Sequence, residues 1–388
     1  MPRNNRFQHQ NYRSALPTSK FHLLRPEPPV HAAPADLTER IARLGTHMRE
    51  ARVAAIYLVH GTFVGADALG FLREIARVWP AVGDLLRRIQ KQTLDSIARE
   101  SGNFTRDYAQ QLQRALQGDH PSPIPVKLFH WSSENHHIGR ADGAVRLLGE
   151  LAAQPLSPGD RLLIWGHSHG GNILALLTNL LANDSATNDR FFRAARPYFC
   201  WPGTNKIDLP AWPRAVQILA DVDHPIRTAQ LDLVTMGTPV RYGWDPGGYA
   251  RLLHFTNHCP SEGLPEHVAN FPPNADEILQ ATGGDVIQQL AIAGTNFAPQ
   301  LWAWRAALAD RALGSLLQSG IRKRDLLNRL RTGCRIHADG VNLLVDYGPR
   351  EGNVAYHHAG HAVYTRSQWM PFHLEQIARH CYGLKTDG

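Results

Sequence analysis

One short segment of the sequence has the residue types and spacing for nucleophilic catalysis. Gly166, Ser168 and Gly170 form a Gly-x-Ser-x-Gly pattern. Small residues two positions either side of the serine allow a sharp turn that exposes its hydroxyl. The pattern gains weight from its context, because an apolar strand-like run at 161–165 precedes it and an apolar helical run at 173–181 follows. We therefore predict that Ser168 is a nucleophile, with an ordinary glycine-rich turn as the alternative.

A second segment, His60-Gly61-Thr62, follows a buried strand predicted at 53–59. Attack of a serine on an acyl group places negative charge on an oxygen, and two backbone N–H groups normally stabilise it. One comes from the residue after the serine, here His169. The other comes from the loop after an upstream strand, where Gly61 permits close approach. We predict that the amides of Thr62 and His169 form this oxyanion hole.

These segments resemble the α/β-hydrolase family, and in particular its lipase and esterase members. The pieces that carry the resemblance are 58–62, 166–171, the later strand end at 236–239 with the sequence Met-Gly-Thr-Pro, and a late histidine. The resemblance extends from about Val53 to Tyr382. It implies a Ser-His-Asp triad that acts through an acyl-enzyme intermediate.

A base must accept the serine proton, and it comes late in the chain if the order is Ser, acid, His. Among 21 histidines we prefer His361, because Gly360 places it in a loop just before an aromatic-containing run. His357 and His358 remain alternatives, and His373 is too close to the terminal helix. His357 and His361 also have the spacing of a helical metal pair, but no glutamate occupies the required position. We predict no metal site.

Three aspartates are candidates for the acid of the triad. The resemblance places it after the penultimate strand, predicted at 251–256, and Asp285 in a Gly-Gly-Asp turn lies in that interval. Asp346 ends the strand predicted at 341–345 and is the second choice, and Asp245 is the third. Each could equally be a turn or capping residue.

The elements that must position these residues follow from the apolar pattern. From residue 51 onward, short apolar runs alternate with helical patterns, which predicts an α/β fold with a mostly parallel sheet and helices on both faces. The expected strands are 53–59, 126–131, 161–165, 231–236, 251–256 and 341–345. Helical patterns are expected at about 68–117, 141–153, 173–181, 299–330 and 374–382.

One catalytic domain with insertions accounts for most of the chain. We expect residues 1–50 to be a partly irregular N-terminal extension, and 51–388 to be the α/β-hydrolase domain, with inserted segments near 183–229 and 260–335. The segment 183–229 is rich in aromatic residues and prolines. It could be a lid or acyl-binding wall, or a surface cover with its own small core, and the pattern does not separate these interpretations.

Composition narrows the class of protein. The chain has 388 residues, of which 43% are hydrophobic, so a sizeable core is expected. The net charge of +7 comes from basic residues mixed with acidic ones, and the densest run, 322–324, is typical of a solvated helix face. We therefore expect no nucleic-acid partner. The sequence shows no membrane-spanning run, no secretory signal and no metal-ligand spacing of its four cysteines, so we expect a cytoplasmic protein.

These observations predict a carboxylic-ester hydrolase that needs no cofactor. Its substrate would be a small-molecule or lipid ester, and peripheral contact with a membrane is left open. Two alternatives remain at this point. A catalytically silent member of the fold could serve as a binding or scaffold protein, and an acyltransferase could use the same nucleophile.

Overall fold

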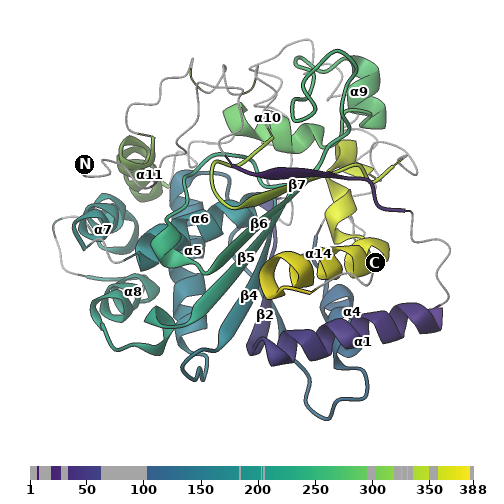
Figure 1. Ribbon diagram of the computed structural model, residues 1–388. Coiled ribbons are helices and arrows are strands. Elements are labelled where there is room, and N and C mark those ends of the chain that lie inside the picture. The colour runs from purple at the N-terminus through teal and green to yellow at the C-terminus, as the bar shows by residue number, and fades with distance from the viewer. Residues whose placement is uncertain are drawn as a thin grey trace.

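Seven parallel strands form the centre of the molecule (Figure 1). The computed structural model describes residues 7, 19–27, 34–62, 103–182, 185–201, 203, 206–294, 303–318, 325, 330, 335–348 and 357–384. The strands are β1 (Phe21–Leu24), β2 (Val53–Val59), β3 (Val126–Phe129), β4 (Arg161–His167), β5 (Gln230–Met236), β6 (Arg251–Asn257) and β7 (Val341–Val345). Their order across the sheet is β1-β7-β6-β5-β4-β2-β3, and every neighbouring pair is parallel. The predicted parallel sheet is therefore confirmed.

Successive side chains of a strand point to opposite faces of the sheet. Because both faces of this sheet are apolar, helices cover both. In β4, Leu162 and Ile164 join the apolar core on one face, and Leu163 and Trp165 join the core on the other. The first face carries α5 (His137–Ala152), α6 (His169–Leu181), α7 (Ser185–Phe199), α8 (Ala211–Ala220) and α11 (Trp304–Leu317). The second carries α1 (Pro34–Glu50), α4 (Arg106–Gln117) and α14 (Met370–Tyr382).

The expected N-terminal extension contributes regular structure to the sheet. Phe21–Leu24 forms β1, which pairs in parallel with β7, and Pro34–Glu50 forms the long helix α1. The strand is only four residues long and lies at the sheet edge, so its apolar pattern is too short to be recognised from sequence. The basic run 322–324 and most of the helical region predicted at 68–117 lie outside the described residues.

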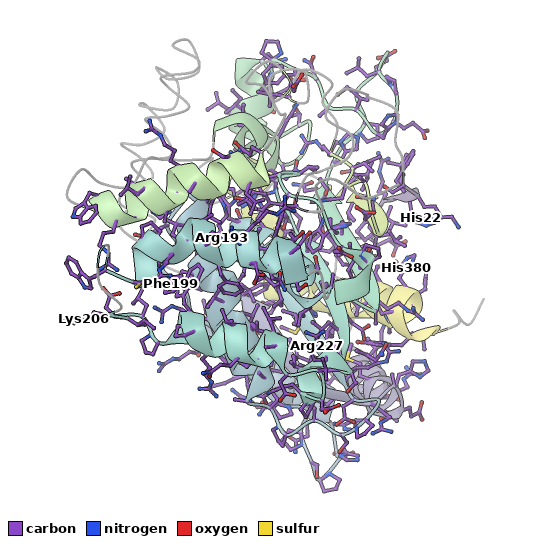
Figure 2. The ribbon with its side chains drawn as sticks, turned by 90° about the vertical axis from the view of Figure 1, so that its left-hand side faces the viewer. His22, Arg193, Phe199, Lys206, Arg227 and His380 are labelled. Atoms are coloured by element: carbon purple, nitrogen blue, oxygen red, sulfur yellow. The ribbon has the colours of Figure 1, made fainter. Side chains whose placement is uncertain are left out.

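The aromatic segment 183–229 contains the helices α7 and α8, of which α8 packs onto α5 and α7 packs onto α11. Trp212 stacks on Phe199 with ring centroids 5.1 Å apart, and its indole N–H donates to Asp142 of α5 at 2.9 Å. Phe199 lies at the end of α7, at the edge of the molecule (Figure 2). Phe191 is fully buried in the same cluster. These aromatic residues thus join the large apolar core on this face of the sheet and form no separate core.

The strand order creates one position where a site is expected. The chain passes from β2 to β3 on one side, and then crosses to β4 on the other side of β2. In parallel sheets, a crevice forms beyond the carboxyl ends of the strands at such a reversal, because the loops diverge. The loops after β2 and β4 contain His60-Gly61-Thr62 and Ser168. Within the described residues, no helix is long and apolar enough to cross a membrane.

Candidate active site

Ser168 lies in the sharp turn that joins β4 to α6. Its backbone has φ 52° and ψ −129°, a conformation that costs an L-residue free energy and that surrounding contacts must hold. Its N–H donates to the carbonyl of Met236 at 2.8 Å, and its own carbonyl accepts from the Thr238 hydroxyl at 2.9 Å and from the Gly171 N–H at 3.1 Å. Met236 at the end of β5 and Thr238 just after it therefore hold the N–H and the carbonyl of Ser168 in place.

The loop after β2 lies directly against Ser168. An alanine Cβ at position 61 would come within 2.6 Å of the Ser168 Cβ, so only glycine fits there. Thr62, the next residue, is buried. His169 is the first residue of α6, where backbone N–H groups have no acceptor within the helix. Of the two residues predicted for the oxyanion hole, His169 thus follows Ser168 in the chain, and Thr62 follows Gly61, which lies against Ser168.

His60 holds this loop in place. Its Nε2 accepts from the Trp131 backbone N–H at 3.3 Å, and its carbonyl accepts from the Trp131 indole at 2.8 Å. Because Nε2 is an acceptor, the proton lies on Nδ1, which donates to the Gly61 carbonyl at 2.8 Å. Burial lowers the pKa of His60 and keeps the ring neutral. His60 thus links the loops after β2 and β3 through hydrogen bonds.

His361 and Asp285 form a buried hydrogen bond. The Nδ1 of His361 lies 2.7 Å from Oδ2 of Asp285, and the two side chains are 2% and 0% exposed. The same carboxylate oxygen accepts from the Tyr364 hydroxyl at 2.8 Å. The other oxygen accepts from the Gln288 N–H at 2.8 Å. These donors hold the carboxylate in place against the imidazole.

The last residue of β6, Asn257, joins the loops that carry the acid and the histidine. Its carbonyl accepts from the Asp285 N–H at 2.8 Å, and its side-chain amide donates to the Gly360 carbonyl at 2.8 Å. A Cβ at Gly360 would meet the Gly284 carbonyl at 2.5 Å, so the two loops are in direct contact. The chain between β6 and Asp285 therefore folds back to the strand end.

His361 lies beside the residues that flank Ser168. Its ring centroid is 4.7 Å from that of His167, and the Nε2 of His167 lies 3.4 Å from the His361 carbonyl. Burial, with a contribution from His361, holds the pKa of His167 well below its ordinary value. The pKa of His169 is also well below normal through burial and nearby positive charge, to which His361 contributes. The structure thus pairs His361 with the first-choice aspartate and places His361 against His167, the residue before Ser168.

The residues that were alternatives for the acid and for the base make other contacts. Asp346 pairs with Arg25 at 2.9 Å, and Asp245 accepts from the Gly247 N–H at 3.0 Å in a short turn. His357 accepts from the Gly360 N–H, and burial lowers the pKa of His358 to about 4. His373 hydrogen-bonds the Tyr347 hydroxyl, on the core side of α14.

Sequence reasoning missed two residues that support the acid. Tyr364 holds the carboxylate, as described above. Arg335 is 1% exposed and donates to the carbonyls of Asp285 at 2.5 Å and Gly283 at 3.1 Å. Neither residue lies in a motif, and both act through loops distant in sequence. Tyr364 could have been noted from its position three residues after His361, whereas nothing around Arg335 signals its role.

Within the described residues, no group of three or more His, Cys, Asp or Glu side chains is arranged to hold a metal ion. Comparisons of the chain with protein-family models, with curated proteins and with solved structures found no match.

Proposed function

We propose that this chain is a serine hydrolase of the α/β-hydrolase type that cleaves carboxylic esters. The observation that carries the proposal is the buried hydrogen bond between His361 and Asp285, placed next to the strained turn of Ser168. A parallel sheet with helices on both faces, and a nucleophile at the reversal in strand order, supports the fold assignment.

In this reaction the Ser168 hydroxyl attacks the ester carbonyl carbon while Nε2 of His361 takes its proton. Asp285 keeps the ring in the Nδ1–H tautomer and stabilises the imidazolium. The amides of Thr62 and His169 donate to the oxyanion. The imidazolium then protonates the leaving alcohol as its C–O bond breaks. Water, deprotonated by His361, attacks the acyl-enzyme, and the acid is released as the Ser168 oxygen regains its proton.

The other histidines around the serine do not compete for its proton. His167 and His169 have pKa values well below normal because they are buried, so both stay neutral at pH 7. Neither makes a hydrogen bond to a described carboxylate. Among the described residues around Ser168, His361 is the histidine with a buried carboxylate partner, as a general base of this kind requires.

The proposal is tested with a fluorophosphonate probe and with release of nitrophenol from 4-nitrophenyl butyrate. The wild-type protein should be labelled at Ser168 and should turn over the ester. Ser168→Ala should lose both properties, while Ser315→Ala, at an exposed position of α11, should retain both. Absence of labelling in the folded wild type, or equal labelling of Ser168→Ala, would refute the proposal.

A further inference from the structure

Four large apolar side chains are exposed where the loop after α7 meets the start of α11. Trp201 and Ile207 lie in that loop, and Trp304 and Leu308 lie in the first two turns of α11. Each is between 44% and 50% exposed, and the two tryptophans are the exposed ones among the tryptophans that the structure describes. Single exposed apolar residues are ordinary, whereas a group of them marks a contact with an apolar partner.

Arg305 joins the two segments that carry these side chains. Its guanidinium lies over the Trp201 ring, 4.5 Å from the centroid. It also donates to two carbonyls at the end of α7, at 2.7 and 2.9 Å. Asp208 of the same loop accepts from its Nη2 at 3.0 Å and balances this charge. Because Arg305 directly follows Trp304, the two exposed tryptophans belong to one region of the surface.

The outward side of α11 is apolar and basic. Its exposed residues are Trp304, Leu308, Arg311 and Ser315. Their spacing of four, three and four positions places them along one side of the helix. The one carboxylate of α11, that of Asp310, is buried and accepts from the Ile138 N–H of α5 at 3.0 Å. A surface helix normally presents a polar side to water, so this side is suited to a partner that is both apolar and negatively charged.

The adjacent helix α7 adds positive charge beside this side of α11. Its exposed basic residues are Arg190, Arg193 and Arg196. Figure 2 looks onto α7 and α11 and shows Arg193 and Lys206 on this face, where Asp189 is the exposed carboxylate of α7. Within the described part of the chain, no ion pair involves Arg193 or Arg311. We call the four apolar side chains, together with the exposed arginines of the two helices, the α7–α11 surface.

The chemistry of the α7–α11 surface matches the boundary layer of an anionic membrane. Indole rings favour the level of the lipid headgroups, and aliphatic side chains such as Leu308 and Ile207 enter the acyl region just beneath it. Guanidinium groups bind the phosphates of the headgroups. A nucleic acid would engage the arginines, but it offers no apolar medium for the aliphatic side chains. An anionic lipid surface satisfies both kinds of side chain at once.

We propose that the α7–α11 surface docks the protein onto membranes that contain anionic lipid. The tryptophan and aliphatic side chains enter the headgroup boundary, while Arg193 and Arg311 contact the headgroup phosphates. The contact is peripheral, since it uses the outward sides of two helices that also pack onto the rest of the fold. This inference stands apart from the proposed function, because the α7–α11 surface contains none of the residues assigned to catalysis.

The experiment is sedimentation of the full chain with lipid vesicles. Vesicles of phosphatidylcholine are compared with vesicles of phosphatidylcholine and phosphatidylserine in equal parts, at low and at high salt. The wild type should bind the phosphatidylserine vesicles more tightly, and salt should weaken this binding by screening the charges. Arg193→Gln and Arg311→Gln should each lower the affinity about fivefold. Arg43→Gln, at an exposed position of α1 on the other face of the sheet, is the matched control and should bind as the wild type does.

The apolar half of the proposal is tested with Trp304→Ser and Leu308→Ser in one chain. This double variant should lower the affinity at least about tenfold, because the apolar area that enters the membrane is lost. The matched control is Leu279→Ser in α9 (Ala275–Gln280), where the leucine is 37% exposed. Brominated acyl chains in the phosphatidylserine vesicles should also quench the tryptophan emission of the wild type, a readout that needs no variant to fold.

Absence of wild-type binding to either kind of vesicle, or equal binding by the variants of the α7–α11 surface and their controls, would overturn the proposal. Binding to duplex DNA or to polyglutamate without binding to vesicles would also overturn it, since the partner would then be a nucleic acid or an acidic protein. Ser168→Ala should bind vesicles as the wild type does. Loss of binding in that variant would place the lipid at the catalytic site and overturn the assignment to this surface. Failure of Ser168 to label would instead overturn the proposed function alone.

Discussion

The two ends of the central strands each bury a carboxylate, but with different partners. At the amino end, Asp232 of β5 is fully buried and accepts from Arg161 of β4 at 2.8 and 3.0 Å. At the carboxyl end, Asp285 is fully buried and pairs with His361 at 2.7 Å. Arginine stays protonated at any ordinary pH, whereas imidazole gains and loses a proton near neutrality. Equal burial therefore accompanies a permanent positive charge at one end and, at the other, the pair that the proposed function uses for proton transfer.

The surroundings of the two carboxylates share one feature, since each also has a tyrosine partner. Burial raises the pKa of Asp232, an effect that Arg161 and a hydrogen bond with Tyr382 oppose. Asp285 accepts from the Tyr364 hydroxyl and from the Gln288 N–H in addition to its contact with His361. The two pairs therefore differ mainly in the nitrogen partner, a guanidinium at the amino end and an imidazole at the carboxyl end.

The largest expected effect comes from Asp285→Asn. The amide preserves the shape but cannot fix the tautomer of His361 or stabilise its charged form. We expect ester turnover to fall about 10⁴-fold. The measurement is kcat for 4-nitrophenyl butyrate, with circular dichroism as the control for folding. Asp346→Asn, at the alternative acid, should retain wild-type turnover, and a similar loss in both variants would contradict the assignment.

Asp232→Asn should lower the free energy of unfolding and leave kcat unchanged. The change leaves the buried side of Arg161 without its anion, and breaking such a pair costs about 3 kcal/mol. Urea unfolding should show this loss as a lower midpoint. The folded fraction should keep wild-type kcat, because Asp232 lies at the opposite end of the sheet. A loss of kcat without a loss of stability would contradict the proposed division between the two ends.

Tyr364→Phe tests the hydrogen bond that supports Asp285, the proposed catalytic carboxylate. It removes one donor from Asp285 and the acceptor of the Asn257 N–H. We expect kcat to fall about tenfold and the free energy of unfolding to fall by about 1–2 kcal/mol. The control is Tyr249→Phe, at a half-buried tyrosine beyond the amino end of β6. Unchanged kcat in Tyr364→Phe would show that the remaining donors suffice.

The smallest expected effect concerns buried histidines that lack a carboxylate partner. Burial lowers the pKa of His254, His258 and His373 to about 3. Between about pH 6.5 and 3 the unfolded chain therefore binds protons that the folded chain does not, so the free energy of unfolding falls as the pH falls. Each group contributes at most about 1.4 kcal/mol per pH unit.

His373→Gln should reduce this pH dependence by up to one group's share. Urea unfolding at pH 7 and pH 5 measures it, with His22→Gln as the control at an exposed position (Figure 2). An unchanged difference between the two pH values in His373→Gln would show that His373 is not one of the groups responsible.

Local pattern was sufficient for six of the seven strands, β1 being the exception, and for the turn at Ser168. An apolar run followed by Gly-x-Ser-x-Gly predicts a strand and a turn within one stretch of chain, and β4, the turn and α6 lie there. The helix begins at His169 and not at the predicted 173, because the glycines that follow the serine already belong to its first turn. The choice of aspartate stayed open, because Asp285 reaches its histidine only through a fold-back onto Asn257 that no local pattern encodes.

The sequence by itself determined the type of sheet, the turn that carries Ser168 and a short list of partners for it. These depend on spacing along the chain and on residue size, which sequence displays directly. Only the tertiary structure decided that His361 meets Asp285, and that Tyr364 and Arg335 hold this aspartate. Those pairings depend on which loops meet at the carboxyl edge of the sheet, since hydrogen bonds and charges act over a few ångströms of space and not over positions in the chain.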